Sequence, residues 1–243
     1  MFTKDTHQET GPVTLAQWML LIVCAGIMNV TAFIGVGVFA THVTGFATLF
    51  GVHAADQRFG NAAAALIVPL FFLAGAMISG LCVEGRVRRD KLPHYDYVMI
   101  LCSAALVFAS WFGDKNNSDT VQTYLHIRKN FVVLSCICLA SGLMNAAISY
   151  SSRATLRITH LTGITTDLGR GIAEIIALKR ARKSEGLKKE LRHNGLRFML
   201  ILSFIVGSLL GAYFFNEIGF NTLLIPAGYF AYAAWHGRNL KKL

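Results

Sequence analysis

Histidine, threonine, asparagine and glycine recur at matched spacings in two parts of this 243-residue chain. The first part contains GIMNV at positions 26–30 and HVTGFATLFG at 42–51, and the second contains GLMNA at 142–146 and HLTGITTDLG at 160–169. Both copies share the patterns G-[IL]-M-N-[VA] and H-[VL]-T-G-x-x-T-x-x-G, at offsets of 116 and 118 residues. Two ordered blocks at nearly the same offset indicate an internal duplication.

The second block of each copy has the residues of a ligand site built on a broken helix. Residues 35–41 are rich in glycine and β-branched residues, so they form helix weakly. Thr44 ahead of Gly45 resembles a helix N-cap, and Thr162 occupies the same position in the second copy. A half-helix that begins there presents free backbone N–H groups and a positive dipole end, which favour an anion or a carboxylate-bearing solute.

Side chains of the two copies extend this candidate site. We expect His42 and His160 to hydrogen-bond or titrate, because histidine titrates near physiological pH. We expect Asn29 and Asn145 to bond the broken backbone of their own half. The full set of candidate substrate-binding residues is Asn29, His42, Thr44, Gly45 and Thr48 in the first copy, and Asn145, His160, Thr162, Gly163, Thr166, Asp167 and Arg170 in the second.

The same residues also allow a plainer interpretation. Small residues and threonine drive helix packing in membranes, so the duplicated motif could mark where two halves cross. Asp167 and Arg170 can pair on one helix face; inside the membrane they are functional candidates, and at its interface they are ordinary surface residues. We favour a pocket because both copies keep the whole pattern, whereas packing requires only small residues. Glycines that suit close helix packing elsewhere are Gly75, Gly80, Gly207 and Gly211.

The composition indicates that the elements carrying these motifs lie in a lipid bilayer. Hydrophobic residues make up 54% of the chain and charged residues only 15%, against about 25% charged residues in soluble domains. Six apolar runs are long enough to span a membrane, and lipid requires them to be helical because the backbone must satisfy its own hydrogen bonds. The runs are 15–39, 62–83, 97–113, 131–150, 196–215 and 218–235.

Each motif copy begins in the first run of a three-run half. Three crossings reverse the direction of the chain, so the second half starts inverted, as in the inverted-topology repeats of transporters. We therefore predict an all-α membrane protein with six transmembrane helices, arranged as two inverted three-helix repeats with broken helices. Eight crossings are the alternative, with 15–55 forming two spans; Arg153, Asp167 and Arg170 make the matching part of the second half a poor span, so six is preferred.

The charges orient this arrangement in the membrane. With the N-terminus in the cytoplasm, only Arg58, Lys115, Arg128 and Lys129 of the 23 Lys and Arg residues lie outside, as the positive-inside rule favours. The basic stretch after the second motif would form an amphipathic helix in the headgroup layer or a solvated loop. The predicted divisions are a cytoplasmic tail 1–14, a first repeat 15–113, an external loop 114–130, a second repeat 131–236 that includes a basic cytoplasmic segment 179–195, and a cytoplasmic tail 237–243.

Other classes of function find little support. A net charge of +10 would suggest nucleic acid on a soluble chain, but basic cytoplasmic loops explain it here, so we expect no nucleic-acid partner. The five cysteines lie in apolar runs without a C-x-x-C pair, so we expect no metal site. The motifs of metalloproteases, serine hydrolases and P-loop proteins are absent. We therefore expect no catalytic residue, no cofactor and no enzyme activity.

At the motif residues the chain resembles the YoaK family of bacterial inner-membrane proteins, which has no established function. The resemblance runs from about Gly26 to the sixth apolar run, and it implies a six-helix protein of that membrane. Two positions depart from the family: Asn29 stands where an aspartate is common, and Phe46 follows the T-G pair where asparagine is common. If the aspartate couples protons, this chain lacks that group. The most specific segments are 26–30, 42–51, 141–147 and 162–169.

The predicted function is the transport of a small solute, with an anion favoured, across the bacterial inner (plasma) membrane. The protein would be multi-pass with both termini cytoplasmic, and its partners would be the lipid bilayer and that solute. A passive channel and a structural membrane protein without transport activity are the alternatives. An intramembrane lipid enzyme would have only His42 and His160 as an acid–base pair. A homo-oligomer is compatible with the sequence.

Overall fold

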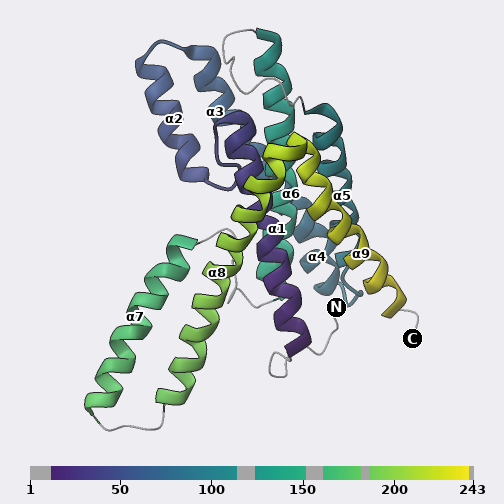
Figure 1. Cartoon of the computed structure of the whole chain (residues 1–243). Helices are drawn as coiled ribbons and strands as arrows, with labels where there is room; N and C mark the ends of the chain where they lie inside the picture. The colour runs from purple at the N-terminus through teal and green to yellow at the C-terminus, as the bar shows by residue number, and fades with distance from the viewer. Residues whose placement is uncertain (1–11, 114–123, 152–160, 182–185, 241–243) are drawn as a thin grey trace.

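The computed structural model describes residues 12–113, 124–151, 161–181 and 186–240. Within these ranges the regular structure is entirely helical, and no strand is present (Figure 1). The elements are α1 Pro12–Val36, α2 Val43–Ala55, α3 Phe59–Cys82, α4 Glu84–Val87, α5 Tyr95–Phe112, α6 Tyr124–Ser151, α7 Leu161–Arg180, α8 Leu187–Ile218, the short 3-10 helix η1 Gly219–Leu223 and α9 Leu224–Leu240.

The protein is a multi-pass integral membrane protein, because several of its helices are long and apolar enough to cross a bilayer. The described part of the chain holds five such stretches: Leu15–Val36, Phe59–Val87, Tyr95–Phe112, Asn130–Ser151 and Leu187–Gly237. The first four coincide with the first four predicted runs. The fifth and sixth runs both fall in the last stretch, which contains α8, η1 and α9.

The chain reverses direction between α8 and α9. Helix α8 ends at Ile218, and Gly219 follows with a φ of +59°. That backbone conformation is in the left-handed region, which glycine adopts without a steric penalty. Figure 1 shows α9 descending beside α5 after this turn. The sixth predicted run therefore corresponds to a separate helix, although α9 is only 17 residues long.

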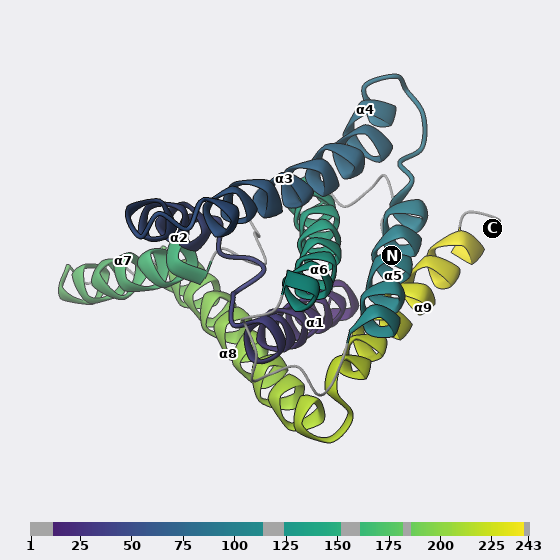
Figure 2. The ribbon, with the colours of Figure 1, turned by 90° about the horizontal axis from the view of Figure 1, so that it is seen from above.

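Four pairs of helices run in opposite directions in Figure 1: α1 and α6, α2 and α7, α3 and α8, and α5 and α9. Seen from above in Figure 2, α1 and α6 occupy the centre, α2 and α3 line one side, α7 and α8 line another, and α5 and α9 line the third. The buried core lies around the two central helices, where Met28 and Met144 of the duplicated motif are fully buried.

Glycines allow α1 to pack closely on α8. A Cβ atom added at Gly26 would collide with the backbone of Phe204, and one added at Gly207 would collide with the backbone of Val23. Gly211 has the same kind of close contact with α1. The packing role predicted for Gly207 and Gly211 is confirmed. Gly26, the first residue of the first motif copy, has a packing role as well.

The crossing of α3 and α6 uses glycines in the same way. A Cβ atom at Gly142 would collide with the backbone of Phe72, and one at Gly75 would collide with the backbone of Leu139. The prediction for Gly75 is confirmed, whereas the prediction for Gly80 is wrong, because no heavy atom lies within 4 Å of a Cβ added there. The G-[IL]-M-N block thus serves helix crossing in both copies, α1 against α8 and α6 against α3.

Candidate functional site

The first motif copy forms a helix break that its own asparagine stabilises. Helix α1 ends at Val36, Gly37 follows with a φ of +81°, and α2 begins at Val43. The Asn29 Oδ1 atom accepts hydrogen bonds from the Thr41 backbone N–H at 3.3 Å and from the Thr41 hydroxyl at 2.9 Å. The prediction that Asn29 bonds the broken backbone of its own half is therefore confirmed.

A second contact joins the same break to α6. The Cys138 thiol on α6 donates a hydrogen bond to the Ala40 carbonyl at 3.1 Å, and both residues are buried. The break is thus fixed between the two central helices. The sequence interpretation missed the roles of Thr41 and Cys138. For Thr41 a signal existed, because Thr159 stands directly before His160 in the second copy as Thr41 does before His42.

His42 occupies the N-terminal end of α2. It is the N-cap residue, its side chain makes no capping hydrogen bond, and its carbonyl accepts the Gly45 N–H at 2.8 Å. The imidazole is exposed and meets the Phe39 ring edge-on, with the ring centroids 6.0 Å apart. The prediction of Thr44 as N-cap is wrong by two positions. The Gly37 turn completes the break earlier, so Thr44 lies inside the first helical turn.

One threonine in each of the helices α2 and α7 makes the same intrahelical hydrogen bond. The Thr48 hydroxyl donates to the Thr44 carbonyl at 3.1 Å, and the Thr166 hydroxyl donates to the Thr162 carbonyl at 2.9 Å. All four threonines are exposed. The hydroxyl protons of Thr48 and Thr166 are therefore engaged within their own helices, and only their oxygen lone pairs are directed to a ligand or to solvent.

The second motif copy places its residues around the start of α7. The helix begins at Leu161, so Thr162 and Gly163 lie in its first turn, and the prediction of Thr162 as N-cap is wrong. His160 lies outside the described residues. Asn145 on α6 is half-buried, and no partner of its Oδ1 atom lies within the described ranges.

Asp167 and Arg170 form an exposed pair on α7. The nearest side-chain atoms are 3.6 Å apart, and the side chains are 53% and 80% exposed. Pairs of this kind contribute about 0–1 kcal/mol.

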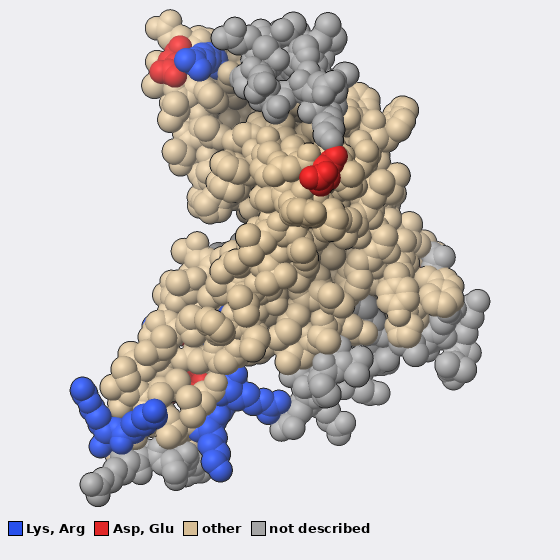
Figure 3. Space-filling view, viewed as in Figure 1, with Lys and Arg blue, Asp and Glu red and all other residues tan. Residues whose placement is uncertain are grey.

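The N-terminal ends of α2 and α7 point toward each other from opposite directions on one side of the molecule (Figure 1). Figure 3 shows that face hollowed between the α2–α3 and α7–α8 hairpins. The motif residues at these helix ends are His42, Thr44 and Gly45 at the start of α2, and Thr162 and Gly163 at the start of α7. Across the described residues, no hydrogen bond or ion pair joins one motif copy to the other. What the arrangement offers chemically is two sets of free backbone N–H groups aimed at one opening.

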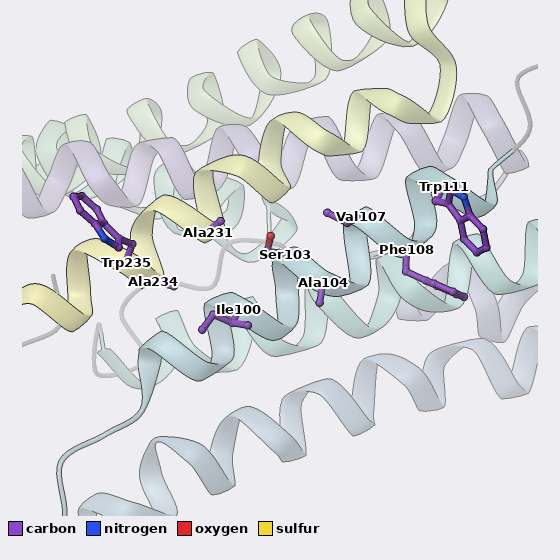
Figure 4. A pocket seen from close by; sticks show the side chains of 9 residues that line it. All are labelled: Ile100, Ser103, Ala104, Val107, Phe108, Trp111, Ala231, Ala234 and Trp235. Atoms are coloured by element: carbon purple, nitrogen blue, oxygen red, sulfur yellow. The ribbon is translucent and has the colours of Figure 1, made fainter.

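A separate apolar groove lies between α5 and α9 (Figure 4). It has a volume of about 580 Å³, its floor includes Ser103, Ala104 and Ala231, and exposed Trp111 and Trp235 flank its two ends. Such a surface suits lipid chains, and it contains no titratable group. The described residues also contain no cluster of three histidine, cysteine or acidic side chains that could hold a metal ion.

Comparison with known proteins gives one result. A family model with the description "Protein of unknown function (DUF1275)" matches residues 17–235. No curated protein and no solved structure matches the chain.

Proposed function

Because the chain belongs to the DUF1275 family, whose description assigns no function, we propose a function from its own structure. The protein is a small-solute transporter that binds its solute between the facing N-terminal ends of α2 and α7. The observation that carries this proposal is that the N-terminal ends of α2 and α7, which carry the second block of each motif copy, face each other. We retain the resemblance to the YoaK family as a prediction beside it.

The helix directions support an inverted repeat. The helices of the two halves correspond in order, α1 to α6, α2 to α7, α3 to α8 and α5 to α9, and the members of each pair run in opposite directions. The close helix crossings also correspond between the halves: the central helix of each half packs against the long helix of the other half, α1 on α8 and α6 on α3. Inverted repeats of this kind place the solute where equivalent segments of the two halves meet. In this chain, that place is the indentation between α2 and α7, and α9 is the sixth span.

The chemistry of the indentation supports an anionic solute. Each short helix directs its free N–H groups and the positive end of its dipole into the opening. His42 and the threonine oxygens at the helix starts supply further hydrogen-bonding groups. None of these residues is a carboxylate, so an anion meets no like charge at the motif positions nearest the opening. No covalent step is part of the proposal, which describes a transporter and not an enzyme.

The distribution of cations supports a cytoplasmic position for both termini. In Figure 3, described Lys and Arg side chains gather at the lower end of the α7–α8 hairpin, toward the end of the molecule where α4 lies and α9 ends in Figure 1. Arg58 pairs with Asp56 in the connection between α2 and α3, at the opposite end. The positive-inside rule places the basic end in the cytoplasm of a bacterial inner membrane. The basic residues at this end include Arg86, Arg88, Arg89, Lys91, Lys179, Arg180, Lys188, Lys189, Arg192 and Arg197.

A specific observation favours one competing function, a structural membrane protein without transport. Gly26 and Gly142, which begin the motif copies, lie at close helix crossings. This explains the first block of the motif by packing alone. It does not explain the second block, whose exposed histidine and threonines lie away from these crossings. The transport proposal therefore rests on the second block.

Flux measurements on proteoliposomes test the proposal. Purified protein is expected to take up labelled phosphate, acetate or glutamate with saturable kinetics, and the variant His42→Ala/His160→Ala is expected to lose that uptake. His236→Ala, on α9, is the matched control and should transport normally. Unchanged saturable uptake in the double variant would contradict the site. Uptake that never saturates would indicate a channel, and no uptake of any of these anions by folded protein would contradict an anion transporter.

A further inference from the structure

A second recess lies between α2, α3 and α6. It has a volume of about 150 Å³ and is lined by residues from the end of α1, the break after it, α2, α3 and α6. An engineered protein cavity of about this volume admits benzene, so the recess has room for a compact ring. Its lining residues are Val36, Val38, Phe46, Leu49, His53, Asn61, Ala64, Ala65, Val68, Asn130, Phe131 and Leu134.

Three neutral polar side chains enter this apolar recess from three different helices. They are His53 from α2, Asn61 from α3 and Asn130 from α6. The Nδ1 atom of His53 is buried, and no partner for it lies among the residues that the structure describes. A buried polar atom without a partner costs about 1–3 kcal/mol. Such an atom therefore calls for a ligand or a water molecule.

The two asparagines add both donors and acceptors. Each amide offers a carbonyl oxygen and an NH₂ group, and both asparagines are half-buried. One buried, unpaired nitrogen and two half-buried amides from three helices thus line the same recess. Their convergence on one recess indicates a ligand that carries both donors and acceptors.

The rest of the lining restricts the ligand further. The lining contains no Asp, Glu, Lys or Arg side chain, so an ion would find no counter-charge from these residues there. Phe46 is buried, and Phe131 packs against the same core. Aromatic walls favour a flat ring that they can contact face-on or edge-on. The ligand chemistry that matches is neutral, planar and amide-like.

We propose that the recess formed by α2, α3 and α6 is a binding site for a small, neutral, planar molecule with amide-type donor and acceptor groups, oriented by His53, Asn61 and Asn130. This site differs from the opening between α2 and α7 in position and in charge preference. The proposal concerns equilibrium binding, so it is tested without measuring flux and does not depend on transport.

The experiment uses the full-length protein in lipid nanodiscs and three probes of similar size. The probes are 2-pyridone, which is a neutral lactam, benzene, which lacks polar groups, and benzoate, which is an anion. Calorimetric titration and thermal unfolding are measured with each. We expect 2-pyridone to bind and to raise the unfolding temperature, with at least tenfold weaker binding of the other two.

Variants assign the binding to the recess. Asn61→Leu and Asn130→Leu should each weaken 2-pyridone binding about tenfold while leaving benzene binding unchanged or tighter. Ala64→Phe fills the recess and should abolish binding, whereas the adjacent, exposed Ala63→Phe is the matched control and should bind normally. Should an asparagine variant fail to fold, the Ala64 and Ala63 pair still decides the location.

Three results would overturn the proposal. The first is a folded wild-type protein that binds none of the probes, which would leave water as the partner of His53. The second is equal binding of benzene and 2-pyridone that the asparagine variants do not change, which would indicate an apolar cavity. The third is preferential binding of benzoate or equal effects of Ala64→Phe and Ala63→Phe.

Discussion

The α2–α3 and α7–α8 hairpins occupy corresponding places in the two halves of the chain. They differ in which of their two helices carries the larger side chains at the contact between them. On α7 the contact residue is Gly171, and a Cβ atom there would collide with the side chains of Asn194 and Glu190 on α8. At the repeat offset of 118 residues, Gly171 corresponds to His53 of α2, which shares a recess with Ala64 of α3. The larger side chains therefore lie on α8 in the α7–α8 hairpin and on α2 in the α2–α3 hairpin.

This difference gives the two hairpins different interiors. Between α7 and α8, Arg197 donates hydrogen bonds to Glu190 at 2.7 Å and to Asn194 at 2.6 Å, and Asn194 is only 6% exposed. This charged network fills the contact. Between α2 and α3, the contact around His53 contains the recess of about 150 Å³. Among the described residues both contacts contain a buried nitrogen without a partner, Asn194 Nδ2 and His53 Nδ1. The comparison teaches that duplicated backbone arrangements can hold a charged hydrogen-bond network in one half and a candidate ligand pocket in the other.

The largest expected loss of stability comes from filling the glycine contacts at the two close helix crossings. Gly75→Leu on α3 and Gly207→Leu on α8 each force a side chain into a facing backbone, so we expect losses of about 3 kcal/mol or more from both. Thermal unfolding and the yield of monodisperse protein measure this. Gly80→Leu, which meets open space, is the control. Tolerance of one crossing substitution but not the other would break the correspondence between the halves.

The next effect tests the difference between the hairpins. Gly171→Ala should destabilise the protein by about 1–3 kcal/mol, because the new methyl group displaces the Glu190–Asn194–Arg197 network. The additional substitution Asn194→Ala should recover part of that loss by making room. His53→Ala on α2 should cost less than Gly171→Ala, since it only enlarges an existing recess. Equal costs in thermal unfolding would show that the two contacts are not packed differently.

A smaller effect is expected at the first helix break. Asn29→Leu removes the acceptor of both Thr41 hydrogen bonds and should cost about 1–2 kcal/mol. Asn29→Asp replaces the amide oxygen by a carboxylate oxygen that can still accept both hydrogen bonds, so it should cost less than Asn29→Leu. Thermal unfolding of the two variants checks this order. The reverse order would mean that the hydrogen bonds to Thr41 do not hold the break.

The smallest effect belongs to the exposed pair on α7. Asp167→Asn and Arg170→Gln should each change stability by no more than about 0.5 kcal/mol, because both side chains are largely exposed. Urea or thermal unfolding measures the change. A loss above about 1.5 kcal/mol would place this pair in an environment that the geometry does not indicate.

Local sequence patterns predicted the features that depend on neighbouring residues. The apolar runs located the helices, the glycine-rich segment located the first break, and Asn29 was correctly assigned to that break. The N-cap was misplaced at Thr44 because a capping pattern in sequence does not reveal that Gly37 turns the chain earlier. The sequence predicts a half-helix near Thr162, and it leaves the basic stretch after the second motif open between an amphipathic helix and a loop, since its charges suit both.

Features that join distant segments were harder to predict. Gly75 and Gly80 are both small residues on one helix, but only Gly75 faces α6, and its facing partner is set by tertiary packing. His53, Asn61 and Asn130 are isolated polar residues in the sequence and come together only when α2, α3 and α6 assemble. No spacing rule connects residues that lie on three helices of different halves.

The most direct test of the central claim is the accessibility of single cysteines at Thr44→Cys and Thr162→Cys, in a background with the native cysteines replaced. Membrane-impermeant maleimide is applied to right-side-out and inside-out vesicles, with Arg58→Cys as the positive control for the outer side. A transporter with a site between α2 and α7 predicts labelling of both cysteines from both sides, as the opening alternates. Protection of both cysteines from both sides, with Arg58→Cys labelled, would contradict the account.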